Sequence, residues 1–364
     1  MSGEEDRRFL RLALSLAARG LGNVWPNPAV GCVIVRDGRI LGRGWTQPGG
    51  RPHAETMALA QAGTAARGAT AYLTLEPCAH FGQTPPCADA LAGAGIARVV
   101  SALQDPDPRV SGRGHARLAE GGAQVEVGLL GAEAEALQKG FLSRIRKGRP
   151  MLTLKLATTL DGRIATASGE SRWITGEAAR AAVHTLRATH DAVMIGGGTA
   201  RADDPLLTIR TFTPLRPAVR IVVSAGLNLS PDSALVRSAT EAPLWLAYAR
   251  DSDTTGWGSR GVRLIPVARS GAGLDPASLL AALGEAGLTR VLCEGGAALA
   301  AALLAAGLVD ELVLFTAGLA FGAGGLAAIA ALPDTRLANT PRFRLAEVRE
   351  IGGDVMQRWV AGGA

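Results

Sequence analysis

Pro52-His53-Ala54-Glu55 is the most informative run in this chain, and two cysteine runs follow it, Glu76-Pro77-Cys78 and Pro85-Pro86-Cys87. One imidazole and two thiolates suit Zn²⁺, and three protein ligands leave the fourth tetrahedral position for water. A metal with such an open position lowers the pKa of that water. Glu55 is not needed as a ligand, so it can carry a proton from the attacking water to a departing amine, as in nucleobase deaminases. These residues predict a hydrolytic zinc deaminase.

Pro52 explains how His53 and Glu55 can share one site. In the middle of a helix, residues two positions apart point to nearly opposite sides. Proline is favoured in the first turn, so a helix that opens here places both side chains at its N-terminal end. Pro86 likewise indicates a helix start at Cys87, where the helix dipole favours a thiolate.

Alternatives to a catalytic zinc site remain open. A closed structural site needs a fourth ligand, and the remaining cysteines are Cys32 and Cys293. Cys32 lies in an apolar run typical of a strand and is better interpreted as a core thiol. His80 is a spare ligand, a substrate contact or a solvated residue. The eight residues between Cys78 and Cys87 exceed the usual Cys-x-x-Cys spacing and indicate an extended substrate loop.

Length and composition restrict the class of protein. The 364 residues exceed one comfortable core, so two domains are expected. We expect a cytoplasmic protein without a membrane segment, because no run resembles a signal peptide or is long enough to span a bilayer, and because the few cysteines suit a reducing compartment. The net charge of +6 and the pI of 9.7 come from dispersed arginines. No basic run with interleaved aromatics is present, so we expect a small-molecule substrate and no nucleic acid.

Strands and helices are expected to alternate, which indicates an α/β layer fold. In the first part the patterns predict helices over 6–19, 53–63 and 87–94 and strands over 30–36, 40–44, 71–75 and 98–102. The polar run 144–150 is interpreted as a linker between domains 1–147 and 150–364. In the second part we expect helices over 177–189 and 297–306 and strands over 151–157, 192–195, 220–224, 243–249, 290–294, 311–316 and 355–360, the last closing the sheet.

Two glycine turns at strand ends, 196–198 and 295–296, precede helix-like sequence in the second part. Such junctions present backbone N–H groups and a positive dipole end to phosphates, although tight αβ turns alone would explain the glycines equally well. Polar residues cluster near them: Lys155, Asp161, Ser171, Arg187, Asp203, Arg210 and Glu294. Arg187 and Arg210 can grip a phosphate with paired donors, or are surface arginines.

Glu294, His184 and His190 are polar residues on or beside expected elements. Glu294 stands at a strand tip before glycines and is more plausible as a ligand contact than as packing. His184 and His190 lie on or just beyond an expected helix and are interpreted as solvated or capping residues without a role.

Together these motifs resemble the bifunctional riboflavin-biosynthesis deaminase/reductase family. The first half carries Pro26-Asn27-Pro28-Ala29-Val30-Gly31, His53-Ala54-Glu55, Glu76-Pro77-Cys78-Ala79-His80, Thr84-Pro85-Pro86-Cys87 and Gln104-Asp105-Pro106. The second half carries Lys155-Leu156-Ala157, Leu160-Asp161-Gly162-Arg163, Gly169-Glu170-Ser171-Arg172-Trp173-Ile174-Thr175 and Ala202-Asp203-Asp204-Pro205. The similarity runs in order over essentially the whole chain.

The resemblance implies a cytidine-deaminase-like αβα domain followed by a dihydrofolate-reductase-like α/β domain. The first would deaminate 2,5-diamino-6-ribosylamino-4(3H)-pyrimidinone 5′-phosphate with Zn²⁺. The second would reduce the ribosyl chain of the product to ribityl with NADPH, whose hydride chemistry the protein positions. A homodimer or larger homo-oligomer is also implied.

Residue roles follow from the same resemblance. His53, Cys78 and Cys87 would hold zinc, Glu55 would transfer protons, and Asn27 would orient the pyrimidine edge. Positions that match NADP contacts are Ala157, Trp173, Thr199, Asp203 and the stretch Gly296–Ala302, which begins with Gly296, Ala297, Ala298 and Leu299. Positions that match substrate contacts are Ser171, Arg187, Leu207, Arg210 and Glu294, while Lys155 and Asp161 would assist opening of the sugar ring.

Some positions depart from the family pattern. Trp25 stands where the family often has His, and Phe81 and Gln83 replace a His and an Arg in the loop between the ligands. These changes bear on the phosphate contacts of the deaminase substrate and not on the metal. The Ala-Pro-Lys of the family is absent near Thr316, so no role is carried over there.

Two competing hypotheses make different predictions. A nucleoside- or tRNA-type zinc deaminase with an unrelated appended domain requires a basic, aromatic strand channel, which the sequence lacks. A non-catalytic zinc-stabilised binding module requires a fourth protein ligand and leaves Glu55 without a function.

Overall fold

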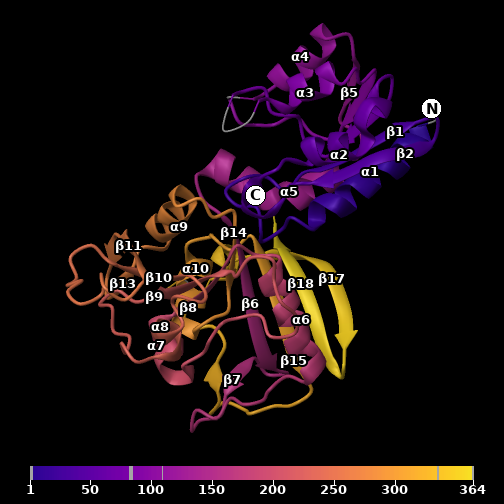
Figure 1. Ribbon diagram of the computed structural model, residues 1–364. Coiled ribbons are helices and arrows are strands. Elements are labelled where there is room, and N and C mark those ends of the chain that lie inside the picture. Colours follow the sequence, from indigo (N-terminus) through magenta and orange to yellow (C-terminus); the bar gives the residue numbers. More distant parts are fainter. Residues whose placement is uncertain (1–2, 82–84, 109, 334–335, 363–364) are drawn as a thin grey trace. The chain divides into compact units, whose positions relative to one another are not determined.

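A computed structural model describes residues 3–81, 85–108, 110–333 and 336–362 of this chain (Figure 1). The chain forms two compact units, Met1–Gly148 and Arg149–Ala364. Both units combine strands with helices, which confirms the predicted α/β class. Within the described part of the chain, none of the helices has the length and apolar character needed to cross a bilayer.

The first unit is built on a five-stranded sheet in the order β2-β1-β3-β4-β5. Its strands are β1 (Gly31–Arg36), β2 (Arg39–Trp45), β3 (Thr70–Leu73), β4 (Arg98–Ser101) and β5 (Gln124–Val127). β1 pairs antiparallel with both β2 and β3, whereas β3, β4 and β5 run parallel. The two parallel connections pass through helices, as crossovers between parallel strands require.

Helices cover both faces of this sheet. They are α1 (Gly3–Ala18), α2 (Ala54–Ala62), α3 (Cys87–Gly93), α4 (Arg113–Glu120) and α5 (Gly131–Lys147). Successive side chains of a strand point to opposite faces, and β1 shows this directly. Ile34 packs in a cluster with α2 and α3, while Val33 packs in another with α1 and α5. β1 is therefore buried on both sides, which explains its nearly continuous apolar sequence.

The second unit contains a nine-stranded sheet in the order β11-β10-β9-β8-β14-β6-β15-β18-β17. Its strands are β6 (Met151–Thr159), β8 (Ala192–Gly196), β9 (Val219–Val223), β10 (Leu244–Ala249), β11 (Arg263–Val267), β14 (Arg290–Cys293), β15 (Glu311–Ala317), β17 (Phe343–Ile351) and β18 (Asp354–Ala361). Pairing is parallel from β11 to β15 and antiparallel at β18 and β17.

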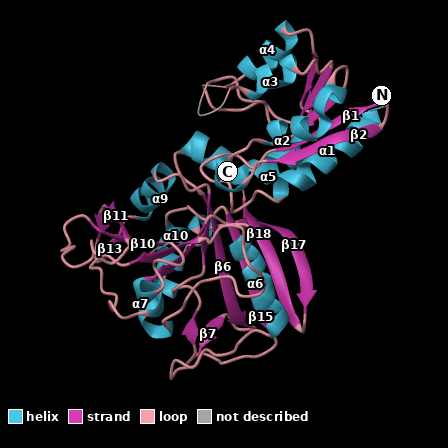
Figure 2. Ribbon diagram, viewed as in Figure 1, coloured by secondary structure: helices cyan, strands magenta, loops and turns pink. Residues whose placement is uncertain are grey.

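The helices of this unit are α6 (Glu177–Ala188), α7 (Gly197–Asp203), α8 (Ala234–Arg237), α9 (Pro276–Glu285) and α10 (Ala297–Ala305). Helix α6 lies across the sheet at β15 and β18 (Figure 2), where Val183 packs against Phe315 and Met356. The remaining short elements are β7 (Arg163–Ala165), β12 (Arg269–Ser270), β13 (Gly273–Leu274), β16 (Leu326–Ala327) and the 3₁₀ turns Pro48–Gly50, Gly63–Ala66 and Leu337–Asn339.

Two expectations about elements are wrong. Residues 144–147, interpreted as part of a linker, form the last turn of α5, because the apolar face of that helix continues through Phe141 and Ile145 into the core. Residues 355–360 do not close the sheet, since β18 lies between β15 and β17. Strand β17 could not be predicted from its sequence, because most of its side chains are exposed and it shows no simple apolar alternation.

Candidate active sites

His53, Cys78 and Cys87 come together in the first unit. His53 is the N-cap of α2 and Cys87 is the first residue of α3, while Cys78 lies in the loop after β3. The Nδ1 atom of His53 is 3.3 Å from Sγ of Cys87 and 3.7 Å from Sγ of Cys78. Two of the three side chains are therefore positioned by helices that start after Pro52 and Pro86, as predicted.

These donors fit a zinc ion. Zinc bonds of about 2.0–2.1 Å to nitrogen and 2.3 Å to sulfur give N···S separations of about 3.6 Å in a tetrahedron, between the two observed distances. The three donor atoms lie within 4.8 Å of one another, and among the described residues no fourth His, Cys, Asp or Glu joins the group. Hydrogen bonds from Cys87 and His53 lower the pKa of the Cys78 thiol to about 4, so this sulfur is a ready thiolate. Cys32, as predicted, is a fully buried thiol of β1.

Glu55 is the second residue of α2 and is 3% exposed. Its carboxyl interacts with the thiol of Cys87 and with the charge of His53. Burial raises the pKa of Glu55, and the charge of His53 opposes that rise. The side chain thus adjoins the three donors without being one of them, which is the arrangement that proton transfer beside a metal requires.

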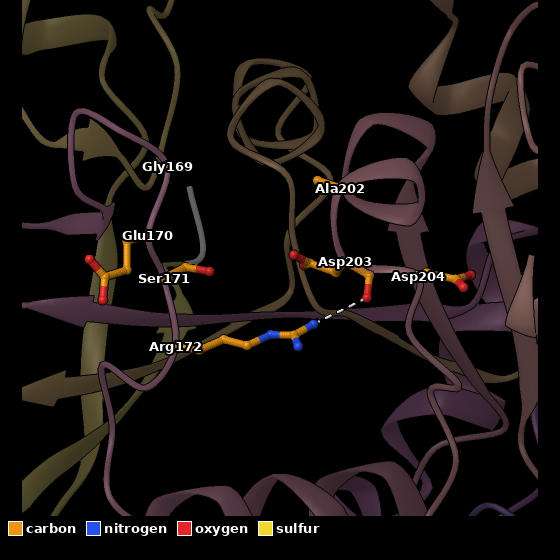
Figure 3. A pocket seen from close by; sticks show the side chains of 7 residues that line it. All are labelled: Gly169, Glu170, Ser171, Arg172, Ala202, Asp203 and Asp204. Atoms are coloured by element: carbon orange, nitrogen blue, oxygen red, sulfur yellow. Dashed lines mark hydrogen bonds between the residues drawn. The ribbon is translucent and has the colours of Figure 1, made fainter.

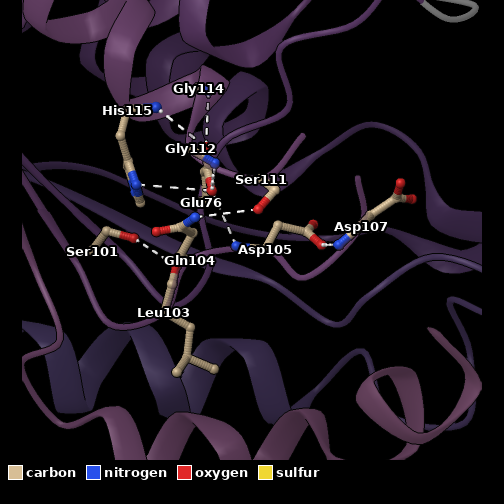
Figure 4. A network of polar contacts seen from close by, with 10 residues as sticks. All are labelled: Glu76, Ser101, Leu103, Gln104, Asp105, Asp107, Ser111, Gly112, Gly114 and His115. Carbon is tan, nitrogen blue, oxygen red and sulfur yellow. Dashed lines mark hydrogen bonds and ion pairs between the residues drawn. The ribbon is translucent and has the colours of Figure 1, made fainter. Parts of the chain in front are cut away.

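Glu76 holds the loop that carries Cys78. Its buried carboxylate accepts backbone N–H bonds from Asp105 (3.1 Å), Gly112 (2.9 Å) and Gly114 (2.9 Å) (Figure 4). The Nδ1 atom of His115 lies 3.8 Å from the same carboxylate. Gly114 must be glycine, because a Cβ there would meet the carbonyl oxygen of Pro77 at 2.0 Å. The carboxylate therefore ties Asp105, Gly112 and the start of α4 to the turn that carries Cys78.

Asn27 packs against the turn that precedes His53. A Cβ on Gly50 would lie 1.9 Å from Nδ2 of Asn27, and Gly50 has φ +88, so that position requires glycine on both counts. His80 is exposed and does not belong to the metal-ligand group, and Phe81 is 74% exposed. Gln83 and Thr84, named from the sequence, lie outside the described residues.

The two predicted glycine turns of the second unit lie side by side, because β8 and β14 are neighbouring parallel strands. Gly196 donates its N–H to the carbonyl of Gly295 at 3.3 Å. Gly296 has φ +96, a conformation that favours glycine, and a Cβ there would lie only 3.0 Å from Oγ1 of Thr199. Ala297, Ala298 and Leu299 then form the first turn of α10, whose N–H groups lack intrahelical partners. This cradle fits a phosphate of a dinucleotide such as NADPH.

A charged cluster adjoins these turns. Arg187 of α6 pairs with Glu294 at the end of β14, with Nε–Oε1 2.5 Å and Nη2–Oε2 2.8 Å. Lys155 of β6 lies within electrostatic reach of both. Burial lowers the pKa of Lys155, and the charge of Glu294 opposes that shift. Burial also acts to raise the pKa of Glu294, but Arg187 and Lys155 outweigh it and hold that pKa below its ordinary value. The structure therefore brings together three of the predicted site residues.

The segment that contains Leu207 and Arg210 meets the same cluster. The Nη1 atom of Arg187 donates to the carbonyl of Thr208 at 2.8 Å. Leu207 is buried and has φ +56, whereas Arg210 is exposed. The charge of Arg210 acts on His184 of α6, as does that of Arg187. Arg210 is thus the accessible cation at the margin of a cluster in which Arg187 is already paired.

A pocket of about 480 Å³ contains Ser171 and Asp203 (Figure 3). Its two walls are segments 169–172 and 202–204, and Nη2 of Arg172 donates to the carbonyl of Asp203 at 3.2 Å between them. Trp173 follows directly and is 66% exposed, with the Arg180 guanidinium 4.6 Å from its ring centre. One face of the indole is therefore already stacked, which orients the ring.

Asp161 and Ala157 are two further site residues that were predicted from the sequence. Asp161 accepts hydrogen bonds from Thr159 Oγ1 (2.5 Å) and from the N–H groups of Phe321 (3.2 Å) and Gly322 (2.6 Å). These contacts organise a turn. Ala157 is half-buried on β6, two residues after Lys155.

Sequence reasoning gave no role to Glu76, His184, Arg172 or Arg180. The pairing of Glu76 with distant backbone N–H groups leaves no trace in the sequence. His184 had a signal that could have been used, because it precedes Arg187 by three residues and therefore shares a face of the helix with it.

Two families match this sequence. Residues 3–103 match the cytidine and deoxycytidylate deaminase zinc-binding region, and residues 150–357 match the RibD C-terminal domain. Among curated proteins, riboflavin biosynthesis protein RibD of Escherichia coli (strain K12) is 45% identical over 96% of this chain and 98% of its own length. The RibD protein of Aquifex aeolicus is 39% identical over 98% of each chain.

Solved structures agree over the full length. Acinetobacter baumannii RibD, form 1, superposes with a TM-score of 0.91 at 36% identity and covers 100% of each chain. A diaminohydroxyphosphoribosylaminopyrimidine deaminase/5-amino-6-(5-phosphoribosylamino)uracil reductase from Thermotoga maritima gives a TM-score of 0.88 at 33% identity over 99% of each chain. The alternative of an unrelated appended domain is not supported, because the second unit matches a reductase domain found with this deaminase.

Proposed function

The chain belongs to the RibD family of bifunctional deaminase/reductases of riboflavin biosynthesis, and from this premise we propose which residues perform each reaction. Residues 1–147 deaminate 2,5-diamino-6-ribosylamino-4(3H)-pyrimidinone 5′-phosphate. Residues 150–364 reduce the ribosyl chain of 5-amino-6-(5-phosphoribosylamino)uracil to ribityl. The observation that carries the first assignment is the convergence of one imidazole and two thiols beside a buried carboxylate.

In the deaminase, His53, Cys78 and Cys87 hold the zinc ion. When bound, zinc supplies a Lewis acid that makes water nucleophilic near neutral pH. Glu55 takes a proton from the attacking water on its carboxylate and gives it to the departing amine, so ammonia leaves as a neutral molecule. The burial of Glu55 supports this role, because a poorly solvated carboxylate is a stronger base than a solvated one. Asn27 orients the pyrimidine edge.

In the reductase, Arg187 and Arg210 anchor the substrate phosphate, and Ser171 and Leu207 contact the rest of the substrate. NADPH supplies the hydride. Lys155 and Asp161 assist opening of the sugar ring, and Glu294 contacts the substrate. The proximity of Lys155, Arg187 and Glu294 supports this assignment, since a lysine with a lowered pKa can exchange protons with a sugar oxygen.

The cofactor is held by the residues around the glycine turns. The cradle of Thr199, Gly296, Ala297, Ala298 and Leu299 binds a phosphate of NADPH, and Ala157, Trp173 and Asp203 contact the remainder. The close approach of Thr199 to Gly296 and the pre-stacked ring of Trp173 support this placement.

We also propose a homo-oligomer in the cytoplasm. Strand β17 is the outer strand of its sheet and exposes Leu345 (43%) and Val348 (56%). Proteins usually protect such an edge, and a second copy of this chain is the partner we propose. All four cysteines are free thiols, which suits a reducing compartment. Light scattering of the full chain measures its mass in solution.

Glu55→Gln tests the deaminase assignment. The variant should retain zinc but release ammonia about 10³-fold more slowly, because it loses a general acid–base. Ammonia and NADPH oxidation are followed together, once with the diaminopyrimidine phosphate and once with the deaminated product. Reduction of the supplied product should be unchanged. Ammonia release at the rate of the unmodified protein would refute the proton-transfer role.

A further inference from the structure

His184 is a buried imidazole with an unsatisfied nitrogen. It lies on α6 and is 8% exposed. Its Nδ1 atom has no hydrogen-bond partner among the described residues. Buried polar atoms in native proteins are nearly always paired, so this nitrogen needs a partner that the described residues do not supply.

A second histidine near the same helix provides the contrast. His190 is also buried, but both of its nitrogens are paired, Nδ1 with the carbonyl of Leu186 at 2.7 Å and Nε2 with Oγ1 of Thr153 at 2.9 Å. His190 is therefore a structural residue that joins the helix end to β6. The Nδ1 atom of His184 has no comparable partner among the described residues.

The position of His184 places it at the reductase site. Residues three apart on a helix are neighbours, and Arg187 is three residues further along α6. The charges of Arg187, Arg210 and Glu294 all act on the imidazole. Burial and the two arginines lower the pKa of His184, so the ring is neutral at physiological pH and offers one donor and one acceptor.

We propose that His184 is a further substrate-binding residue of the reductase, whose imidazole makes a hydrogen bond with a hydroxyl of the phosphorylated sugar chain. This inference rests on the proposed placement of the substrate at Arg187 and Arg210. The two arginines suit the doubly charged phosphate, whereas a neutral imidazole suits a neutral hydroxyl, which both donates and accepts.

Three substitutions of His184 test the inference in the full-length protein with 5-amino-6-(5-phosphoribosylamino)uracil and NADPH. His184→Phe keeps the ring volume and removes the hydrogen bond. His184→Asn places an amide near the position of Nδ1, and His184→Gln places one near Nε2. The Phe variant should raise the substrate KM about tenfold, the loss expected for one hydrogen bond. Its KM for NADPH and its ammonia release should not change.

One of the two amide variants should restore the substrate KM to within about threefold of the original value. An unchanged KM in His184→Phe would overturn the inference. An equal rise in all three variants, or an equal rise in the KM for NADPH, would also overturn it, because either result indicates packing alone. If His184→Phe does not fold, the Asn and Gln variants decide, since binding through one nitrogen requires their KM values to differ.

Arg187→Ala, measured in parallel, separates this inference from the proposed site. A raised substrate KM in Arg187→Ala with no change in His184→Phe rejects His184 and retains the site. No change in either variant rejects both. A raised substrate KM in both variants, with rescue by one amide, supports both.

Discussion

The two candidate sites are built on different scales. The deaminase site takes its three donors from two helix starts and one turn, between His53 and Cys87, and brings them within 4.8 Å. The residues proposed for the reductase site come from β6, α6, α7, β14 and α10, between Lys155 and Leu299. A metal ion requires its ligands at fixed short distances. A dinucleotide and a sugar phosphate are long molecules that make many separate contacts.

The charges of the two sites are also managed differently. In the deaminase, the charge of two thiolates is matched by one divalent ion. In the reductase, Arg187 and Glu294 neutralise each other, with side chains only 11% and 9% exposed. Pairing avoids the cost of an isolated buried charge. Substitution of a deaminase ligand should therefore remove one metal contact. Substitution of Arg187 or Glu294 should also leave its partner with an unpaired buried charge.

Removal of the metal should have the largest effect, and it should affect the deaminase reaction only. A chelator should abolish ammonia release, because the proposed reaction uses zinc as the Lewis acid that activates water. NADPH oxidation with the deaminated substrate should persist, and added Zn²⁺ should restore ammonia release. Loss of both activities on chelation would break the contrast between the sites.

Glu76→Gln should weaken the deaminase through its scaffold. An amide presents an NH₂ group to backbone N–H donors that now meet a carboxylate, and an unsatisfied buried donor costs about 1–3 kcal/mol. We expect a lower melting temperature and reduced zinc content by atomic absorption. Glu120→Gln, at the exposed C-terminal end of α4, is the matched control. Full zinc content and an unchanged melting temperature would show that the backbone N–H bonds to Glu76 do not support the turn that carries Cys78.

Arg187→Ala should raise the KM of the reductase for its substrate about 10- to 100-fold, the loss of charged hydrogen bonds. It should also destabilise the protein, because Glu294 is left buried without its partner. Arg187→Lys keeps the charge but not the paired donors, so its substrate KM should lie between those of the original protein and Arg187→Ala. Arg250→Ala, at an exposed arginine after β10, is the control. An unchanged substrate KM would remove Arg187 from the site.

Acid should destabilise the second unit through His190, with a smaller effect. Burial lowers the pKa of His190 to about 3, so the unfolded chain binds more protons than the folded one below a pKa of about 6.5. The contribution of His190 to the free energy of unfolding is therefore fully present above about pH 6.5 and is lost as the pH falls. Between pH 7 and 5.5 the loss should be about 1 kcal/mol.

Urea unfolding of the original chain and of His190→Gln at both pH values measures this difference. The variant should lack that part of the pH dependence. Identical pH dependence in the two proteins would mean that folding leaves the pKa of His190 unchanged. The stability difference would then have to come from another group.

Much of the fold could be predicted from local signals. The strand at 31–36 shows an apolar run, and the helices at 54–62 and 87–93 begin directly after prolines or ligand residues. The edge strand 343–351 was missed because its side chains are mostly exposed, and the helix end at 144–147 was missed because its outer face is polar.

The deaminase ligands were predicted because their residue types and spacing carry the chemistry within a short length of chain. The reductase residues came mainly from the family resemblance. No local pattern reveals that Arg187 pairs with Glu294, since that contact exists only because α6 packs beside the end of β14.

The sequence alone determined the donor set, the helix starts that present it, and the alternation of strands and helices. These properties depend on neighbouring residues, through backbone preference and side-chain period. The tertiary structure alone decided which backbone N–H groups fill the Glu76 carboxylate, that the two glycine turns lie side by side, and that one nitrogen of His184 stays unpaired. Those contacts depend on which distant strands become neighbours, and strand order is a result of packing the whole unit.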